Sequence, residues 1–187
     1  MPKDQSADLS ISSRELIHNG MVWDVVREQF DYRGVTLTRE FVAHPGAVAV
    51  VALNDKNEVL LIKQYRHPVR SFLWELPAGL RDQPGEALVA AAQRELLEET
   101  GYVAEHWSEL IEFHTTPGGN SETISIFLAR NLVFAGHNFE LHGEEVDLEV
   151  AWFALDEVLE SILKSDMRNP AVSVGIMAAS LKLNRNA

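Results

Sequence analysis

The most informative segment of this 187-residue sequence spans residues 79–102 and reads GLRDQPGEALVAAAQRELLEETGY. Its body is rich in alanine and leucine, which favour helices. Gly101 stands where a left-handed residue commonly ends a helix. With Pro84 near the start and Glu86 in the first turn, the pattern predicts a helix from about residue 84 to residue 100.

The acidic residues of this predicted helix fall on one side of it. Glu95 and Glu99 are four residues apart, so their side chains emerge within about 40° of each other, and Glu98 lies about 60° to the other side of Glu95. Carboxylates at this spacing destabilise a helix unless a cation neutralises them. Oxygen ligands without cysteine or paired histidine suit Mg²⁺, with Mn²⁺ as a second choice. The alternative is a solvated acidic surface, the more common origin of adjacent glutamates.

Short apolar segments on both sides of the helix predict β-strands. They are expected at residues 21–27, 35–42, 47–53, 59–63, 109–115, 122–130 and 147–153, with closing helices at 155–164 and 171–183. Residues 1–12 are polar and are expected to be loose. Strands with a few interspersed helices indicate a mixed sheet covered by helices, that is, an α/β or α+β fold.

The amino-acid composition of the chain excludes several classes of function. The chain has 16 Lys and Arg against 28 Asp and Glu, a net charge of −12, so a nucleic-acid partner is not expected. It has no cysteine, which excludes disulfides, thiolate nucleophiles and Cys-ligated zinc. We see no signal peptide and no apolar run near the roughly 20 residues that span a bilayer, so we expect a cytoplasmic protein without a membrane partner.

The segment 79–102 resembles the signature box of the Nudix hydrolases, G-x5-E-x7-R-E-U-x-E-E-x-G-U, in which U is a bulky apolar residue. The matching positions are Gly79, Glu86, Arg94, Glu95, Leu96, Glu98, Glu99, Gly101 and Tyr102. From Glu86 onward every specified position matches. The one departure is that six residues, not five, separate Gly79 from Glu86.

The resemblance implies the Nudix fold, an α/β/α sandwich with a mixed β-sheet. It also implies Mg²⁺-dependent hydrolysis of a nucleoside diphosphate linked to another group. The implied metal ligands are the backbone carbonyl of Ala78 and the carboxylates of Glu95, Glu99 and Glu98, the last either as a third ligand or as a catalytic group just behind the ligands. Arg94 would orient a carboxylate, and Glu86 would support the box.

Four further segments are similar to the ADP-ribose pyrophosphatase branch of this family: residues 62–66, 74–79, 117–122 and 143–150. With the box, they extend the resemblance over roughly residues 20–180. The substrate-binding residues that it implies are Arg39, Arg66, Glu75, Gly118, Gly119 and Glu122. The guanidinium of Arg66 suits a diphosphate by bidentate hydrogen bonding, and the alternative is an ordinary surface arginine.

The general base is expected in the acidic segment before the last strand. The branch places a glutamate five residues before the position held here by Glu149, which gives Glu144. Glu145 is adjacent, and the sequence does not choose between the two. A solvated acidic loop is the alternative for this segment.

Residues 1–45 are expected to form an N-terminal antiparallel β extension, and residues 46–187 the Nudix domain with its C-terminal helix. In this branch such an extension is exchanged between two subunits, so the resemblance implies a homodimer. It also implies a small-molecule nucleoside diphosphate sugar as substrate, first of all ADP-ribose, split to AMP and ribose 5-phosphate. Two alternatives stay open: a pyrophosphatase acting on GDP-mannose or another nucleotide sugar, and a sensor that binds ADP-ribose without cleaving it.

Overall fold

The computed structural model describes residues 1–136 and 148–185. The chain divides into two compact units. The first unit comprises Met1–Pro45 and His114–Glu122, and the second comprises Gly46–Phe113 and Thr123–Ala187. Each unit is described below by itself.

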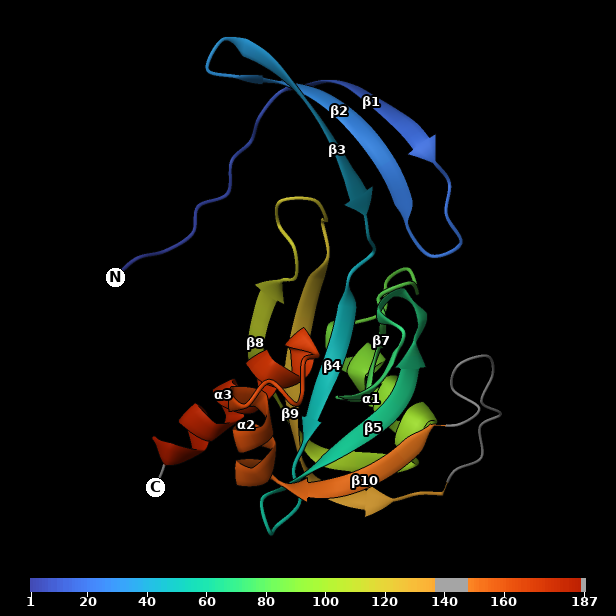
Figure 1. The fold of residues 1–187 in the computed structure, drawn as a ribbon, viewed down its shortest axis with the longest axis vertical. Helices are drawn as coiled ribbons and strands as arrows, with labels where there is room; N and C mark the ends of the chain where they lie inside the picture. The colour runs from blue at the N-terminus through green and yellow to red at the C-terminus, as the bar shows by residue number, and fades with distance from the viewer. Residues whose placement is uncertain (137–147, 186–187) are drawn as a thin grey trace. The chain divides into compact units, whose positions relative to one another are not determined.

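The first unit contains a three-stranded antiparallel sheet of order β1-β2-β3 (Figure 1). Its strands are β1 (Ile11–His18), β2 (Asp24–Tyr32) and β3 (Val35–Ala43). A two-residue turn joins β2 to β3, with Arg33 and Gly34 both at positive φ (55° and 82°), the geometry that suits a tight hairpin. Two strands of an antiparallel extension were predicted here, at residues 21–27 and 35–42, and β2 and β3 correspond to them. The extent of β1 was not predicted, because every residue of this strand is exposed and no alternation of buried side chains marks it.

The second unit contains two sheets. The larger one has the order β7-β4-β9-β8, formed by β7 (Ala78–Leu80), β4 (Ala47–Ala52), β9 (Thr123–Phe134) and β8 (Tyr102–His114). It is mixed, because β4 pairs with β9 in parallel and with β7 antiparallel. The other sheet has the order β10-β5-β6, formed by β10 (Glu149–Ala154), β5 (Glu58–Arg66) and β6 (Ser71–Glu75), with a 3-10 turn at His67–Val69 between β5 and β6.

Helices cover both faces of β4 (Figure 1). On one face, Val48 and Val50 pack in a core with Ala92 and Leu96 of α1 (Leu88–Thr100). On the other face lie α2 (Leu155–Leu163) and α3 (Pro170–Asn184), whose apolar residues share a core with Ala49 and Val51 of β4. The α/β/α sandwich with a mixed sheet is thus confirmed, together with both closing helices.

Helix α1 begins four residues later than the sequence pattern predicts. Gly85 has a φ of +82°, a conformation that a helix cannot include, and the N–H of Glu86 closes a turn on the carbonyl of Gln83. The predicted end is confirmed: Gly101 has a φ of 73°, and its N–H donates to the carbonyl of Leu97 at 2.9 Å. In the described part of the chain, no helix is both long enough and apolar enough to cross a membrane.

Candidate active site

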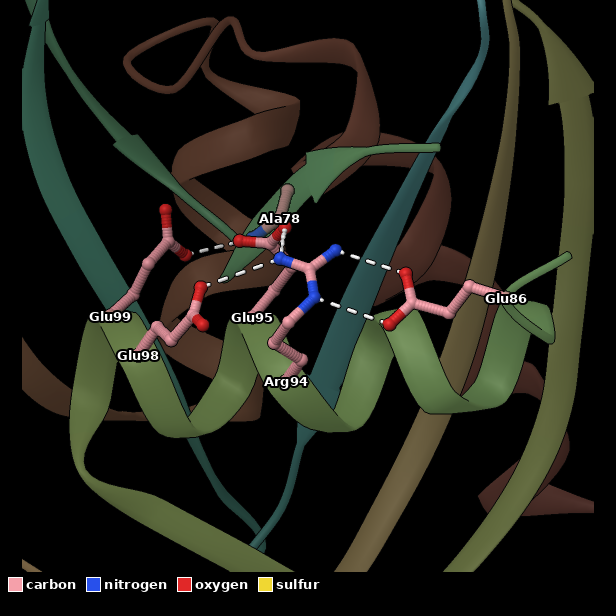
Figure 2. Close-up of polar contacts among 6 residues, drawn as sticks. All are labelled: Ala78, Glu86, Arg94, Glu95, Glu98 and Glu99. Atoms are coloured by element: carbon pink, nitrogen blue, oxygen red, sulfur yellow. Dashed lines mark hydrogen bonds and ion pairs between the residues drawn. The ribbon is translucent and has the colours of Figure 1, made fainter. Parts of the chain in front are cut away.

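The centre of the candidate site is a network of ion pairs around Arg94 on α1 (Figure 2). The guanidinium of Arg94 makes two hydrogen bonds to Glu86, from Nε to Oε1 at 3.2 Å and from Nη2 to Oε2 at 3.1 Å. Its Nη1 donates to Glu95 at 2.6 Å and contacts Glu98 at 3.4 Å. These partners raise the pKa of Arg94, led by the hydrogen bonds to Glu86, so the guanidinium stays charged. One cation therefore ties the loop before α1 to two of its acidic residues.

The third acidic residue of the helix is held by the neighbouring strand. The backbone N–H of Ala78, the first residue of β7, donates to Oε2 of Glu99 at 2.9 Å. Glu99 is buried, with 6% of its surface exposed. Figure 2 shows Glu95, Glu98 and Glu99 projecting from one side of α1, toward Ala78. The shared face predicted from helical spacing is what places these side chains together.

Glu95 occupies the space that Gly79 leaves empty. A Cβ atom added at Gly79 would lie 2.0 Å from the carboxylate carbon of Glu95, so a larger residue there would require the Glu95 carboxylate to shift. Burial raises the pKa of the Glu95 carboxyl, Arg94 opposes this shift, and the carboxylates of Glu98 and Asp82 add to it. The extra residue between Gly79 and Glu86 leaves this contact in place, because Gly79 is fixed by β7 and not by the loop.

The donor atoms at this site are of the chemical type that binds a hard divalent cation. Its atoms are carboxylate oxygens on one face of α1, beside a strand that begins at Ala78, and such oxygens are the ligands that Mg²⁺ and Mn²⁺ prefer. In the parts of the chain that the structure describes, no three acidic or histidine side chains are gathered closely enough to hold a metal ion as they stand. Instead, Arg94 and the Ala78 N–H engage the carboxylates.

A second ion pair lies on the β5–β6 hairpin of the same unit. Arg66, at the end of β5, donates from Nε to Oε1 of Glu75 at 3.0 Å and from Nη2 to Oε2 at 2.7 Å. Glu75, at the end of β6, is 4% exposed. The structure thus brings together two residues that the sequence analysis names separately as substrate-binding.

Glu122 lies in the first unit, where its carboxylate contacts the side chains of Thr115 and His44. Its Oε2 accepts a hydrogen bond of 2.8 Å from the hydroxyl of Thr115, and its Oε1 lies 3.6 Å from Nε2 of His44. No motif marks Thr115 or His44 in the sequence. Their proximity to Glu122 follows from the fold of this unit.

The other predicted substrate-binding residues of the first unit are exposed. Gly118 and Gly119 have nothing within 4 Å of an added Cβ atom, and the carbonyl of Gly119 accepts from the N–H of Val42 at 2.9 Å. Arg39 on β3 donates to the carbonyl of its neighbour Thr38 at 2.8 Å. The predicted bases, Glu144 and Glu145, lie outside the described residues.

The chain matches a model of a known protein family. A family model described as NUDIX domain matches residues 43–172. The chain therefore belongs to the Nudix family of hydrolases, as the signature box had indicated.

Two curated relatives share most of the chain's length. An ADP-ribose pyrophosphatase of Mycobacterium tuberculosis (strain ATCC 25618 / H37Rv) is 37% identical over 91% of this chain and 83% of its own length. An ADP-ribose pyrophosphatase of Bacillus subtilis (strain 168) is 34% identical over 91% of each chain. Among solved structures, one described as an ADP compounds hydrolase superposes with a TM-score of 0.80, covering 99% of each chain at 23% identity. At that identity, the last comparison supports the fold alone.

Proposed function

We propose that this chain hydrolyses the diphosphate of ADP-ribose to AMP and ribose 5-phosphate in a Mg²⁺-dependent reaction. The observation that carries the proposal is the set of three carboxylates on one side of α1, held by Arg94 and by the Ala78 N–H. The two relatives that match over 91% of the chain support ADP-ribose as the substrate.

The proposed ligands of the Mg²⁺ ion are the carbonyl of Ala78 and the carboxylates of Glu95, Glu98 and Glu99. When bound, such an ion neutralises charge on the nonbridging phosphate oxygens and lowers the pKa of water. The chain itself carries a net charge of −12 and would otherwise repel an anionic substrate. Arg94 keeps two of the carboxylates in place by direct hydrogen bonds.

The proposed reaction is an in-line displacement by water. The oxygen of water forms a bond to one phosphorus while the bond from that phosphorus to the bridging oxygen breaks, and the bridging oxygen leaves with the other phosphate. Glu144 or Glu145 accepts the proton of the water, because a carboxylate in hydrogen-bond reach is the general base that this step needs. Arg66 binds the anionic diphosphate through its guanidinium.

We further propose a homodimer that forms through the three-stranded sheet of the first unit. In the three-stranded sheet of this unit, only Val26 is buried, while Ile11, Leu16 and Val35 are more than half exposed (55–58%). A second sheet that covers exposed apolar side chains removes them from water, and this burial stabilises the pair of sheets. The proposed contributions of this unit to substrate binding come from Arg39, acting on the partner's site, and from Gly118, Gly119 and Glu122.

The deciding experiment is a substrate panel with product identification in ¹⁸O-labelled water. Purified protein is incubated with Mg²⁺ and ADP-ribose, GDP-mannose or a dinucleoside polyphosphate. We expect turnover of ADP-ribose, with AMP and ribose 5-phosphate as products and one labelled phosphate oxygen. Preferred turnover of GDP-mannose would show that the substrate is this nucleotide sugar and not ADP-ribose, while the proposed type of reaction would stand. Tight binding of ADP-ribose without turnover of any compound would contradict hydrolysis and favour a sensor.

A further inference from the structure

The carboxylate of Glu75 is fully engaged by Arg66. Both of its oxygens accept hydrogen bonds from the guanidinium, at 3.0 and 2.7 Å, and its side chain is only 5% exposed. The side chain of Arg66, in contrast, is 42% exposed. In this pair, therefore, a ligand arriving from solvent meets the guanidinium, and the carboxylate lies behind it.

Strand alternation shows which side of the sheet carries the pair. Side chains two residues apart on a strand share a face, so Arg66 lies on the same face of β5 as Leu60. Leu60 packs in the core beside Leu96 of α1, so this face is the one toward α1. Ile62, two residues after Leu60, lies on this face as well. Glu75 is paired with Ile62 across the two strands, so its side chain lies on the same face. The pair is thus on the side of the sheet that carries the proposed metal site.

The chain after β6 leads directly to the proposed metal site. Glu75 stands three residues before Ala78, whose N–H holds Glu99. Two residues lie between them, and the carbonyl of the second, Pro77, accepts a hydrogen bond of 2.9 Å from the N–H of Val50 on β4, which ties this connection to the central sheet. The carboxylate that contacts Arg66 therefore belongs to the same segment as Ala78, and this hydrogen bond ties the segment to β4.

We infer that Glu75 is a positioning residue that orients the guanidinium of Arg66 toward the diphosphate of the substrate, without touching the substrate itself. The inference rests on the proposed function for the identity of the ligand. A guanidinium fixed in one plane loses less conformational freedom when it binds a phosphate bidentately than a free arginine side chain does.

The role of Glu75 in orienting Arg66 and the negative charge of Glu75 predict opposite effects of a substitution at Glu75 on the binding of an anion. If only net charge mattered, removing the negative charge of Glu75 would strengthen the binding of an anion to Arg66. If Glu75 acts by orientation, the same change weakens binding, because the guanidinium no longer has two fixed acceptors. The substitution Glu75→Gln separates the two, since it removes the charge at nearly constant size.

The test is a double-mutant cycle of Glu75→Gln and Arg66→Lys. Lysine keeps the positive charge beside the buried carboxylate but cannot make the two-point contact. The first readout is the dissociation constant of ADP measured by titration calorimetry in EDTA, and the second is KM and kcat for ADP-ribose with Mg²⁺. The matched control is Glu160→Gln, which removes the carboxylate of an exposed ion pair between Glu160 on α2 and Lys164, the residue that follows this helix. Circular dichroism and thermal unfolding verify that each variant is folded.

We expect Glu75→Gln to weaken ADP binding about tenfold and to raise KM about as much, with a smaller change in kcat. In the Arg66→Lys background, the same substitution should have little further effect. Glu75→Asp, which keeps the charge but shortens the side chain, should recover part of the affinity and serves as the second variant if Glu75→Gln unfolds. The control should bind ADP like the wild type.

Two results would overturn the inference. Equal or tighter ADP binding by Glu75→Gln would show that orientation by Glu75 is unimportant. An equal loss in both backgrounds would show that Glu75 contacts the ligand independently of Arg66. Wild-type protein that binds ADP but does not cleave ADP-ribose would instead overturn the proposed function, while the binding cycle would still decide the role of Glu75.

Discussion

The backbone N–H of Ala78 donates a 2.9 Å hydrogen bond to Oε2 of Glu99, which joins β7 to the last turn of α1. Glu99 is 6% exposed, and a carboxylate at that burial needs a hydrogen-bond partner. The Ala78 N–H supplies one without adding a charge. Glu95, in contrast, accepts from a charged group, the guanidinium of Arg94.

The first prediction concerns the charge of Glu99. Glu99→Gln keeps an oxygen that can accept from Ala78 but removes the charge of a proposed metal ligand. We expect kcat/KM for ADP-ribose to fall about 100-fold at limiting Mg²⁺, while the thermal unfolding temperature measured in EDTA stays close to that of the wild type. Near-normal turnover of the variant at limiting Mg²⁺ would contradict the metal assignment.

The second prediction concerns the space at Gly79. Gly79→Ala places a methyl group within 2.0 Å of the Glu95 carboxylate, so this side chain must move. We expect a loss of about 1–3 kcal/mol in the free energy of unfolding, measured in urea, and a weaker stabilisation by Mg²⁺. Gly118→Ala is the stability control, because nothing lies within 4 Å of its added Cβ atom. Equal stability of the two variants would show that the contact between Gly79 and Glu95 is not tight.

The third prediction concerns Arg94. Arg94→Ala leaves Glu86 and Glu95, both largely buried, without their common cation. We expect a loss of about 2 kcal/mol in the free energy of unfolding without metal. Arg94→Lys should fall between the wild type and Arg94→Ala, since an ammonium group keeps the charge but cannot bridge the two carboxylates as a guanidinium does. Urea unfolding that finds Arg94→Ala as stable as the wild type would show that the network contributes little.

The fourth prediction separates the two proposed bases. Glu144→Gln and Glu145→Gln are compared side by side with respect to kcat and to the stabilisation that Mg²⁺ confers on thermal unfolding. The base variant should lose about 100-fold or more in kcat and keep the stabilisation by Mg²⁺, because it removes a proton acceptor and no metal ligand. If neither variant changes kcat, the base lies elsewhere.

The fifth prediction concerns the proposed dimer. Light scattering coupled to size-exclusion chromatography should give twice the mass of one chain. Leu16→Lys and Val35→Lys place charges on the exposed sheet of the first unit and should shift the protein toward the monomer. Leu163→Lys, at an exposed position on α2, is the control and should stay dimeric. A monomeric wild type, or dissociation by the control alone, would contradict this interface.

The sequence was most informative where a pattern is local. The end of α1 at Gly101 follows from the glycine alone, because the left-handed conformation at a helix end disfavours other residues. The common face of the α1 carboxylates follows from helical geometry. The start of α1 was missed by four residues, because the positive φ of Gly85 is a property of the turn before it, and no residue pattern distinguished that turn from a first helical turn.

The sequence was least informative where a strand has little apolar alternation. The N-terminal half of β8 was not predicted, because most of its side chains are exposed. The extent of β1 was missed for the same reason. In such strands the pairing defines the element: β1 pairs with β2, and β8 neighbours β9 in its sheet.

By itself, the sequence determined the family, the α/β/α class and the acidic face of α1, since spacing along one helix fixes which side chains lie together. Only the tertiary structure decided how those side chains are held. It assigned Glu99 to the N–H of Ala78, placed Glu95 against Gly79, and joined Arg66 to Glu75. These contacts link residues on different strands and helices, and their distances depend on how sheets and helices pack, which no local spacing encodes.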